Sequence, residues 1–217
     1  MCMKYLIVTG GMTTDEIITN VIKKGGYEVV IAVDSGTEFL YRAEIIPDII
    51  VGDLDSADPK IIDYYRGFQY IDFCILDSEK DDTDTEHAIR EAVRRGADDI
   101  TIVGGTGTRL DHVIGNITLL GIGLEHNVPI TIIDEHNRIR MINQPIVLRK
   151  KEQYGKYISL LPFSGEVTGV TLKGLKFPLE NYTMGGFNSL GISNEIVDDE
   201  ASISLTSGQL LVIESRD

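Results

Sequence analysis

The chain has 217 residues, 42% of them hydrophobic and 25% charged, which is the balance of an ordinary globular protein of one or two domains. Its formal net charge of −14 disfavours a nucleic-acid partner, because binding to a phosphate backbone requires a positive surface. We find neither a secretory signal nor an apolar run near the ~20 residues that span a membrane, so we expect a cytoplasmic protein without a membrane partner.

Strand-like and helix-like segments alternate through residues 1–137. Short apolar, β-branched runs predict six strands, and apolar residues at spacings of three and four predict helices between them. The helix after the fourth strand begins with a capping box from Thr83 to Glu86. This alternation predicts an α/β domain with a doubly wound, mostly parallel sheet. The expected strands are Lys4–Val8, Glu28–Val33, Ile49–Val51, Tyr70–Leu76, Ile100–Val103 and Pro129–Ile133.

Residues 138–217 follow a different pattern, because helical periodicity disappears and short alternating runs separated by glycines take over. Such runs are typical of an all-β domain, and we expect a sandwich. The expected strands are Arg138–Ile142, Ile146–Arg149, Tyr157–Leu161, Val167–Leu172, Ser202–Leu205 and Leu210–Glu214.

Polar clusters follow five of the six strands predicted in the first domain. Ligands of open α/β sheets bind outside the carboxyl ends of the strands, so these clusters predict a ligand site along one edge. The clusters are TGG at 9–11, DSG at 34–36, GDLDS at 52–56, KDDTD at 80–84 and GGTGTRLDH at 104–112.

Aspartates dominate two of these clusters, with Asp53 and Asp55 in one and Asp81, Asp82 and Asp84 in the other. Each aspartate has a structural alternative, either an Asx turn or capping of the next helix. However, four or five carboxylates brought together would repel one another strongly. A divalent cation such as Mg²⁺ removes that repulsion, so the aspartates favour a metal site.

The glycine-rich cluster lies between a strand and the first turn of a helix, where backbone N–H groups favour phosphate oxygens. Arg109 can bind phosphate with its forked guanidinium, whereas Asp111 can instead compensate the helix dipole. His112 is equally consistent with a ligand contact and with an ordinary position on the helix surface. The cluster is not a P-loop, because the sequence has no GxxxxGK[ST] segment.

Five motifs in chain order together resemble the thiamin pyrophosphokinase family. The resemblance runs from Val8 to the C-terminus and implies transfer of the pyrophosphoryl group of ATP to the hydroxyl of thiamin, with Mg²⁺ and release of AMP. It also implies a nucleotide-binding α/β domain, a thiamin-binding β-sandwich, and a homodimer whose sites lie between subunits. The motifs are DSG at 34–36, PDIIVGDLDS at 47–56, KDDTDTEHA at 80–88, GGTGTRLDH at 104–112 and LGISNE at 190–195.

The same resemblance assigns roles to individual residues. Metal ligands are expected at Asp53, Asp55 and Asp84, and the catalytic set adds Asp81, Arg109 and Asp111. Contacts to thiamin are expected from Asp111, His112, Ser193 and Asn194. The nucleotide is expected to contact Asp34, Ser35, Gly36, Gly104, Gly105, Thr106 and Gly107.

One departure from the family pattern concerns the thiamin site, where eukaryotic members use a tryptophan. This chain has no tryptophan, which leaves Phe187 or a tyrosine as the stacking residue. The general base also stays open between Asp84 and Asp111.

Two other functions remain as alternatives. A Mg²⁺-dependent phosphatase with an aspartate nucleophile accounts for GDLDS but not for the glycine-rich cluster or the β domain. A non-catalytic sensor of nucleotide or thiamin phosphate accounts for the fold but does not need so many carboxylates.

Overall fold

A computed structural model describes residues 2–77, 81–163 and 165–217, and it divides the chain into two compact units, Met1–Glu135 and His136–Asp217. The boundary predicted after residue 137 lies two residues further along, within the first strand of the second unit. Ser78, Glu79 and Lys80, which belong to the predicted acidic loop, lie outside the described residues.

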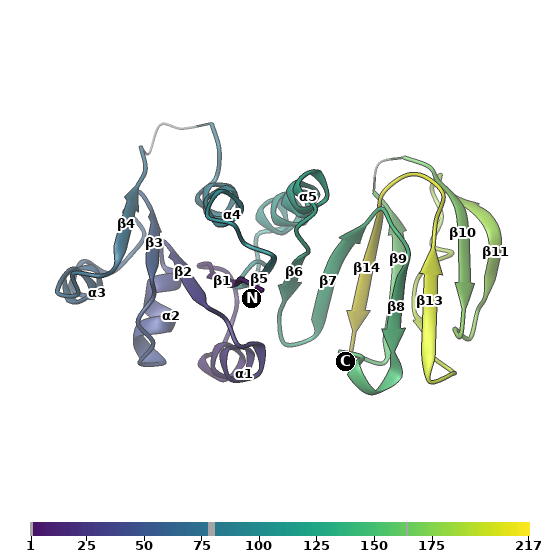
Figure 1. Cartoon of the computed structure of the whole chain (residues 1–217), viewed down its shortest axis with the longest axis horizontal. Coiled ribbons are helices and arrows are strands. Elements are labelled where there is room, and N and C mark those ends of the chain that lie inside the picture. The colour runs from purple at the N-terminus through teal and green to yellow at the C-terminus, as the bar shows by residue number, and fades with distance from the viewer. Residues whose placement is uncertain (1, 78–80, 164) are drawn as a thin grey trace. The chain divides into compact units, whose positions relative to one another are not determined.

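The first unit is built on a six-stranded parallel sheet with the order β6-β5-β1-β2-β3-β4 (Figure 1). The chain winds outward from β1 to β4, then crosses to the other side of β1 to form β5 and β6. The fold is therefore doubly wound, as predicted, with its topological switch point between β1 and β5. The strands are β1 (Lys4–Val8), β2 (Val29–Val33), β3 (Ile49–Gly52), β4 (Asp72–Ile75), β5 (Asp99–Val103) and β6 (Ile130–Ile133).

Helices cover both faces of this sheet, with α4 and α5 on one face and α1, α2 and α3 on the other (Figure 1). The inner strands β1, β3 and β5 are consequently buried on both faces, as parallel strands usually are, whereas the edge strand β4 stays partly exposed. Among the helices in the described parts of the chain, none is both long enough and apolar enough to cross a bilayer. The helices are α1 (Asp15–Gly25), α2 (Gly36–Arg42), α3 (Pro59–Arg66), α4 (Asp84–Arg94) and α5 (Leu110–His126).

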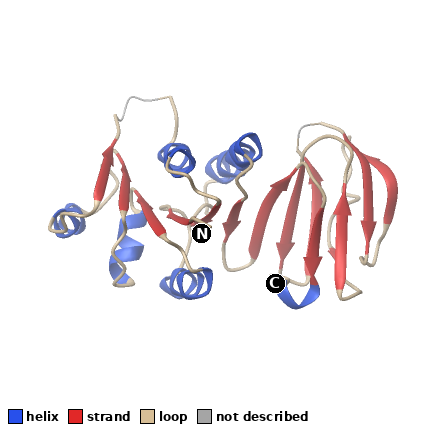
Figure 2. Cartoon of the chain, in the orientation of Figure 1, coloured by secondary structure: helices blue, strands red, loops and turns tan. Residues whose placement is uncertain are grey.

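The second unit is built almost wholly of strands (Figure 2) and forms the predicted sandwich. Its two antiparallel sheets have the orders β12-β9-β14-β7 and β11-β10-β13-β8, and their facing side chains form one apolar core. The strands are β7 (Asn137–Ile142), β8 (Ile146–Arg149), β9 (Tyr157–Pro162), β10 (Val167–Lys173), β11 (Leu179–Met184), β12 (Asn194–Glu195), β13 (Glu200–Ser204) and β14 (Leu210–Ser215), with a short 3₁₀ turn, η1 (Lys150–Glu152).

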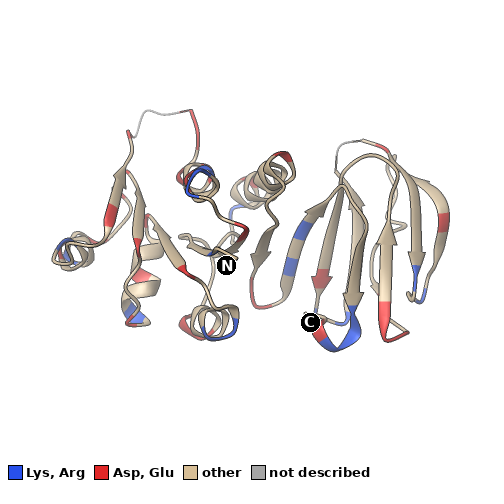
Figure 3. Ribbon diagram, in the orientation of Figure 1, with Lys and Arg blue, Asp and Glu red and all other residues tan. Residues whose placement is uncertain are grey.

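A buried ion cluster ties β7 to β14 in the second unit. Figure 3 marks basic positions along β7 and an acidic position on the neighbouring β14. The carboxylate of Glu214 is inaccessible to solvent and accepts hydrogen bonds from Arg138 Nε at 2.5 Å and Arg140 Nη2 at 2.6 Å. The backbone N–H of Tyr154 donates a further bond at 3.1 Å. A buried charge is destabilising unless it is paired, and Arg138 is the residue that lies opposite Glu214 in the register of these two strands.

Candidate active site

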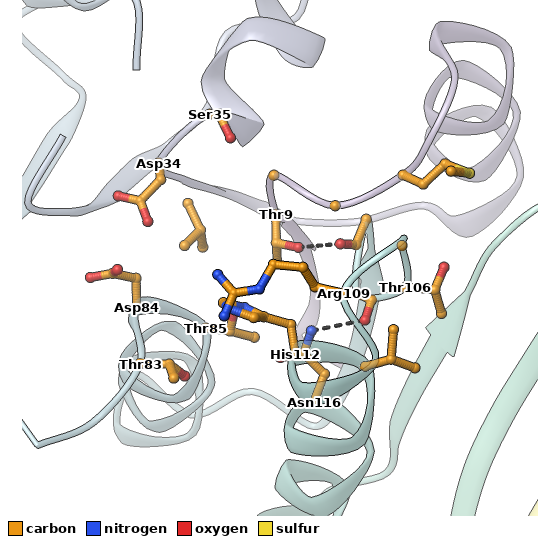
Figure 4. A pocket seen from close by; sticks show the side chains of 18 of the residues that line it. Thr9, Asp34, Ser35, Thr83, Asp84, Thr85, Thr106, Arg109, His112 and Asn116 are labelled. Carbon is orange, nitrogen blue, oxygen red and sulfur yellow. Dashed lines mark hydrogen bonds between the residues drawn. The ribbon is translucent and has the colours of Figure 1, made fainter. Parts of the chain in front are cut away.

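A pocket of about 550 Å³ opens at the switch point of the first unit, beyond the carboxyl ends of β1, β2 and β5 (Figure 4). The loops after these strands form its floor, and the first turns of α4 and α5 form its wall. This is where a doubly wound sheet binds its ligand. The residues that line it are Thr9, Gly10, Gly11, Met12, Val33, Asp34, Ser35, Ser56, Thr83, Asp84, Thr85, Gly104, Gly105, Thr106, Gly107, Thr108, Arg109, His112, Val113 and Asn116.

The pocket brings together only part of the residue set predicted from the sequence. The predicted residues that line it are Asp34, Ser35, Asp84, Gly104, Gly105, Thr106, Gly107, Arg109 and His112. The predicted residues outside its lining are Gly36, Asp53, Asp55, Asp81, Asp111, Ser193 and Asn194, the last two of which belong to the second unit. Thr9, Gly10 and Gly11 of the predicted TGG cluster also line it, and so do Met12 and Asn116, which were given no role from the sequence.

Asp34 and Asp84 face each other across one end of the pocket (Figure 4). Asp34 has a left-handed backbone, with φ of 47°, and its Oδ1 atom is buried without a hydrogen-bond partner among the described residues. A Cβ atom on Gly52 would lie 1.9 Å from this oxygen. The glycine of the GDLDS motif therefore makes room for the Asp34 carboxyl group.

The electrostatics of this end of the pocket are unfavourable for a further negative charge. Burial, then a hydrogen bond with Asp84 and the negative charges of Asp84 and Asp53, raise the pKa of Asp34 to about 7. Near neutral pH, a proton on Asp34 therefore offsets the repulsion between these carboxyl groups. A cation placed there would do the same.

Asp53 and Asp55 form a local turn beside this end. The Asp55 N–H donates to Asp53 Oδ1 at 3.0 Å, which is the Asx turn considered as the structural alternative, and the Asp55 side chain is exposed. Within the described ranges, the structure holds no group of three or more His, Cys, Asp and Glu side chains arranged to bind a metal ion.

The donor set nevertheless fits Mg²⁺, which is usually bound by one or two carboxylates together with substrate phosphates. The fit rests on the unpartnered Oδ1 atom of Asp34 and on the carboxyl group of Asp84 opposite it.

The other end of the pocket is suited to anions. Helix α5 begins after Arg109 without a side-chain cap among the described residues, whereas Thr14 and Thr83 cap α1 and α4. Uncapped N–H groups at a helix N-terminus attract phosphate oxygens. Arg109 adds a positive charge at the same place.

Arg109 is held by Asp111 through a two-point contact, with Nη2–Oδ2 at 2.6 Å and Nε–Oδ1 at 3.3 Å. The hydrogen bond from Arg109 is the main reason that the pKa of Asp111 falls to about 2. Both side chains are largely exposed, so a phosphate can replace Asp111 as the partner of the guanidinium.

One of the predicted thiamin residues of the second unit, Asn194, binds the backbone of a residue with an exposed aromatic ring. Asn194 is buried, and its amide accepts from the Phe177 N–H at 2.9 Å and donates to the Phe177 carbonyl at 2.8 Å. The Phe177 side chain itself is 60% exposed. Asn194 thus fixes the backbone that presents Phe177, while Ser193 beside it is exposed.

Comparisons with known proteins decide the family. Residues 24–132 match the model of the thiamin pyrophosphokinase catalytic domain, and residues 144–210 match its vitamin B1 binding domain. Thiamine pyrophosphokinase of Bacillus subtilis is 36% identical over 190 residues, 86% of this chain and 87% of that protein. The chain belongs to the thiamin pyrophosphokinase family. The resemblance drawn from the five motifs is confirmed, and so is the expectation of an enzyme.

Solved structures of the family share the whole fold. The crystal structure of the Bacillus subtilis enzyme matches with a TM-score of 0.88 at 33% identity and covers 99% of both chains. The structure from Geobacillus thermodenitrificans matches with a TM-score of 0.85 at 32% identity and covers 99% of this chain and 98% of that one. Asp34 and Asp84 lie within the residues matched to the catalytic-domain model, and Phe177 and Asn194 lie within those matched to the vitamin B1 binding model.

The raised pKa of Asp34 makes a testable prediction about stability. Because this pKa is raised from 3.8 in an unperturbed chain to about 7 in the folded state, the folded state binds the proton more tightly. The stabilisation is complete below about pH 4 and is lost as pH rises towards 7. We expect Asp34→Asn to remove this loss and to raise the melting temperature at pH 8 by about 2–4 °C, with no gain at pH 4.

Thermal unfolding in EDTA from pH 4 to 8 measures the effect, with the exposed Asp55→Asn as the matched control. If the melting temperatures of the wild type and Asp34→Asn changed in parallel with pH, the raised pKa of Asp34 would be contradicted.

Proposed function

We propose that this enzyme transfers the pyrophosphoryl group of ATP to the hydroxyl of thiamin, which yields thiamin diphosphate and AMP. The observation that carries the proposal is the pocket at the switch point, which has a carboxyl pair at one end and an uncapped helix N-terminus with Arg109 at the other. Such a site suits a magnesium nucleotide, because phosphoryl transfer depends on positioning and charge neutralisation rather than on a covalent nucleophile.

We assign the phosphate chain to the glycine-rich loop after β5 and the first turn of α5. Backbone N–H groups of the loop bind the phosphate oxygens, and Arg109 exchanges Asp111 for a phosphate. His112 lines the same wall one turn into the helix. The Ser35 side chain lies at the opposite rim, beside Asp34.

We assign Mg²⁺ to the carboxyl end of the pocket. Asp34 and Asp84 are its proposed direct ligands, and Asp53, Asp55 and Asp81 are the outer carboxylates of the predicted set. When bound, Mg²⁺ neutralises the negative charge that develops on the phosphoryl oxygens. The residues of this chain orient the phosphate chain, and Asp34 gives up its proton when the cation arrives.

We assign thiamin to the exposed ring of Phe177 and to Ser193, which precedes Asn194 in the chain. A rigid aromatic face at a fixed backbone position is well suited to stacking on the flat rings of thiamin. Phe187 is also exposed, but Asn194 fixes Phe177 and not Phe187, so Phe177 is the better replacement for the missing tryptophan.

The first prediction of this proposal concerns the bond of ATP that breaks. With ATP, Mg²⁺ and thiamin, we expect AMP and thiamin diphosphate in equal amounts, and neither product without thiamin or metal. Asp84→Asn should lower turnover by at least ~10²-fold, the scale of one lost electrostatic stabiliser. The exposed Asp63→Asn on α3 is the matched control.

Resolved nucleotides and thiamin phosphates separate the alternatives. Formation of ADP with thiamin monophosphate would refute pyrophosphoryl transfer. Phosphate release without thiamin would indicate the phosphatase, and unchanged ATP would indicate the sensor.

We further propose a homodimer whose active sites lie between subunits, as the family resemblance implies. An Asp84→Asn chain and a Phe177→Ala chain each lack one half of the site. Mixing them should therefore restore part of the activity, because a hybrid dimer carries one intact site. Phe187→Ala in place of Phe177→Ala is the control, and it should retain activity before mixing.

Sedimentation of the mixed sample shows whether the restored activity belongs to a dimer. A fully active monomer, or mixtures no more active than the separate variants, would contradict the proposal.

A further inference from the structure

Two side chains from different elements hold successive carbonyl groups of the glycine-rich loop (Figure 4). The hydroxyl of Thr9, at the end of β1, donates to the Gly104 carbonyl at 2.6 Å. The amide of Asn116, in the second turn of α5, donates from Nδ2 to the Gly105 carbonyl at 2.8 Å. Neither bond belongs to a helix or a strand, so both serve the conformation of the loop.

Backbone N–H groups of the β1–α1 loop also bind carbonyl groups of the glycine-rich loop. The Gly11 N–H donates to the Gly104 carbonyl at 3.0 Å, and the Met12 N–H donates to the Thr106 carbonyl at 2.7 Å. The carbonyl groups of three successive residues, 104 to 106, are thereby each held by a donor outside the loop.

Peptide geometry turns these bonds into a constraint on the loop's N–H groups. Every peptide bond described in the chain is trans, so each C=O points away from the N–H of the next residue in the same plane. Holding the three carbonyls therefore fixes the directions of the N–H groups of Gly105, Thr106 and Gly107, each of which points away from the carbonyl before it. N–H donors that are already fixed bind phosphate oxygens without an ordering cost at the moment of binding.

We propose that Asn116 is a positioning residue for the phosphate chain, acting through the Gly105 carbonyl. This inference rests on the nucleotide site proposed above. Among these donors Asn116 is the one that comes from α5, the helix whose N-terminus lies in the pocket. Thr9 performs the corresponding task from β1.

The test measures binding of magnesium tripolyphosphate, magnesium ATP and adenosine by calorimetry. We expect Asn116→Leu to lower the affinities for tripolyphosphate and for ATP by the same factor, about tenfold. The reason is that one hydrogen bond to a buried carbonyl is lost. Adenosine should bind unchanged. Asn116→Gln keeps the amide donor and should restore most of the affinity.

Thr118→Val is the matched control, because it removes a side chain–carbonyl bond of 3.0 Å from the same helix without touching the loop. If the melting temperature of Asn116→Leu is well below that of this control, Thr9→Val tests the same constraint on the loop from β1. It should lower the affinity for tripolyphosphate in the same way.

Unchanged tripolyphosphate binding in both variants would overturn the positioning role alone. Loss of adenosine binding with tripolyphosphate retained would also overturn it, since Asn116 would then contact the nucleobase. A wild-type protein that binds no tripolyphosphate would overturn the proposed nucleotide site together with this inference.

Discussion

Close approach of backbone segments at the carboxyl ends of the parallel strands is the constraint on which the site depends. A Cβ atom on Gly11 would lie 2.1 Å from the Gly104 carbonyl oxygen, and one on Gly52 would lie 1.9 Å from Asp34 Oδ1. Glycine removes both clashes. The β1–α1 loop can then bind the glycine-rich loop, and the Asp34 carboxyl can occupy the end of the pocket. Substitution at either glycine would push apart groups whose spacing the proposed chemistry requires.

The fold could be predicted because the decisive signals are local. Thr83 and Glu86 predicted the start of α4, and the Thr83 hydroxyl accepts from the Glu86 N–H at 3.2 Å. Two strands of the sandwich were missed, and both lack such a signal. Strand β11 is mostly exposed and pairs with β10 in an irregular register, while β12 has only two residues and is defined by its contact with β9.

The candidate site was harder to predict, because its contacts join residues that are distant in the sequence. Asp34 was expected to contact the nucleotide and Asp84 the metal, but nothing in their spacing shows that their carboxyl groups meet. Asp53 and Asp55 looked like a ready metal pair, yet Asp53 accepts from the Asp55 backbone. Asn116 gave no signal at all, since its partner is a backbone carbonyl that every residue possesses.

We propose that one cation and the phosphate chain lie between the carboxyl pair and the glycine-rich loop. Paramagnetic broadening of backbone amide signals tests it directly, with Mn²⁺ in place of Mg²⁺ and a non-hydrolysable ATP analogue. We expect the signals of Asp34, Asp84 and residues 105–107 to broaden first, and Asp84→Asn to weaken the effect. Broadening centred elsewhere, with these signals still sharp, would contradict it.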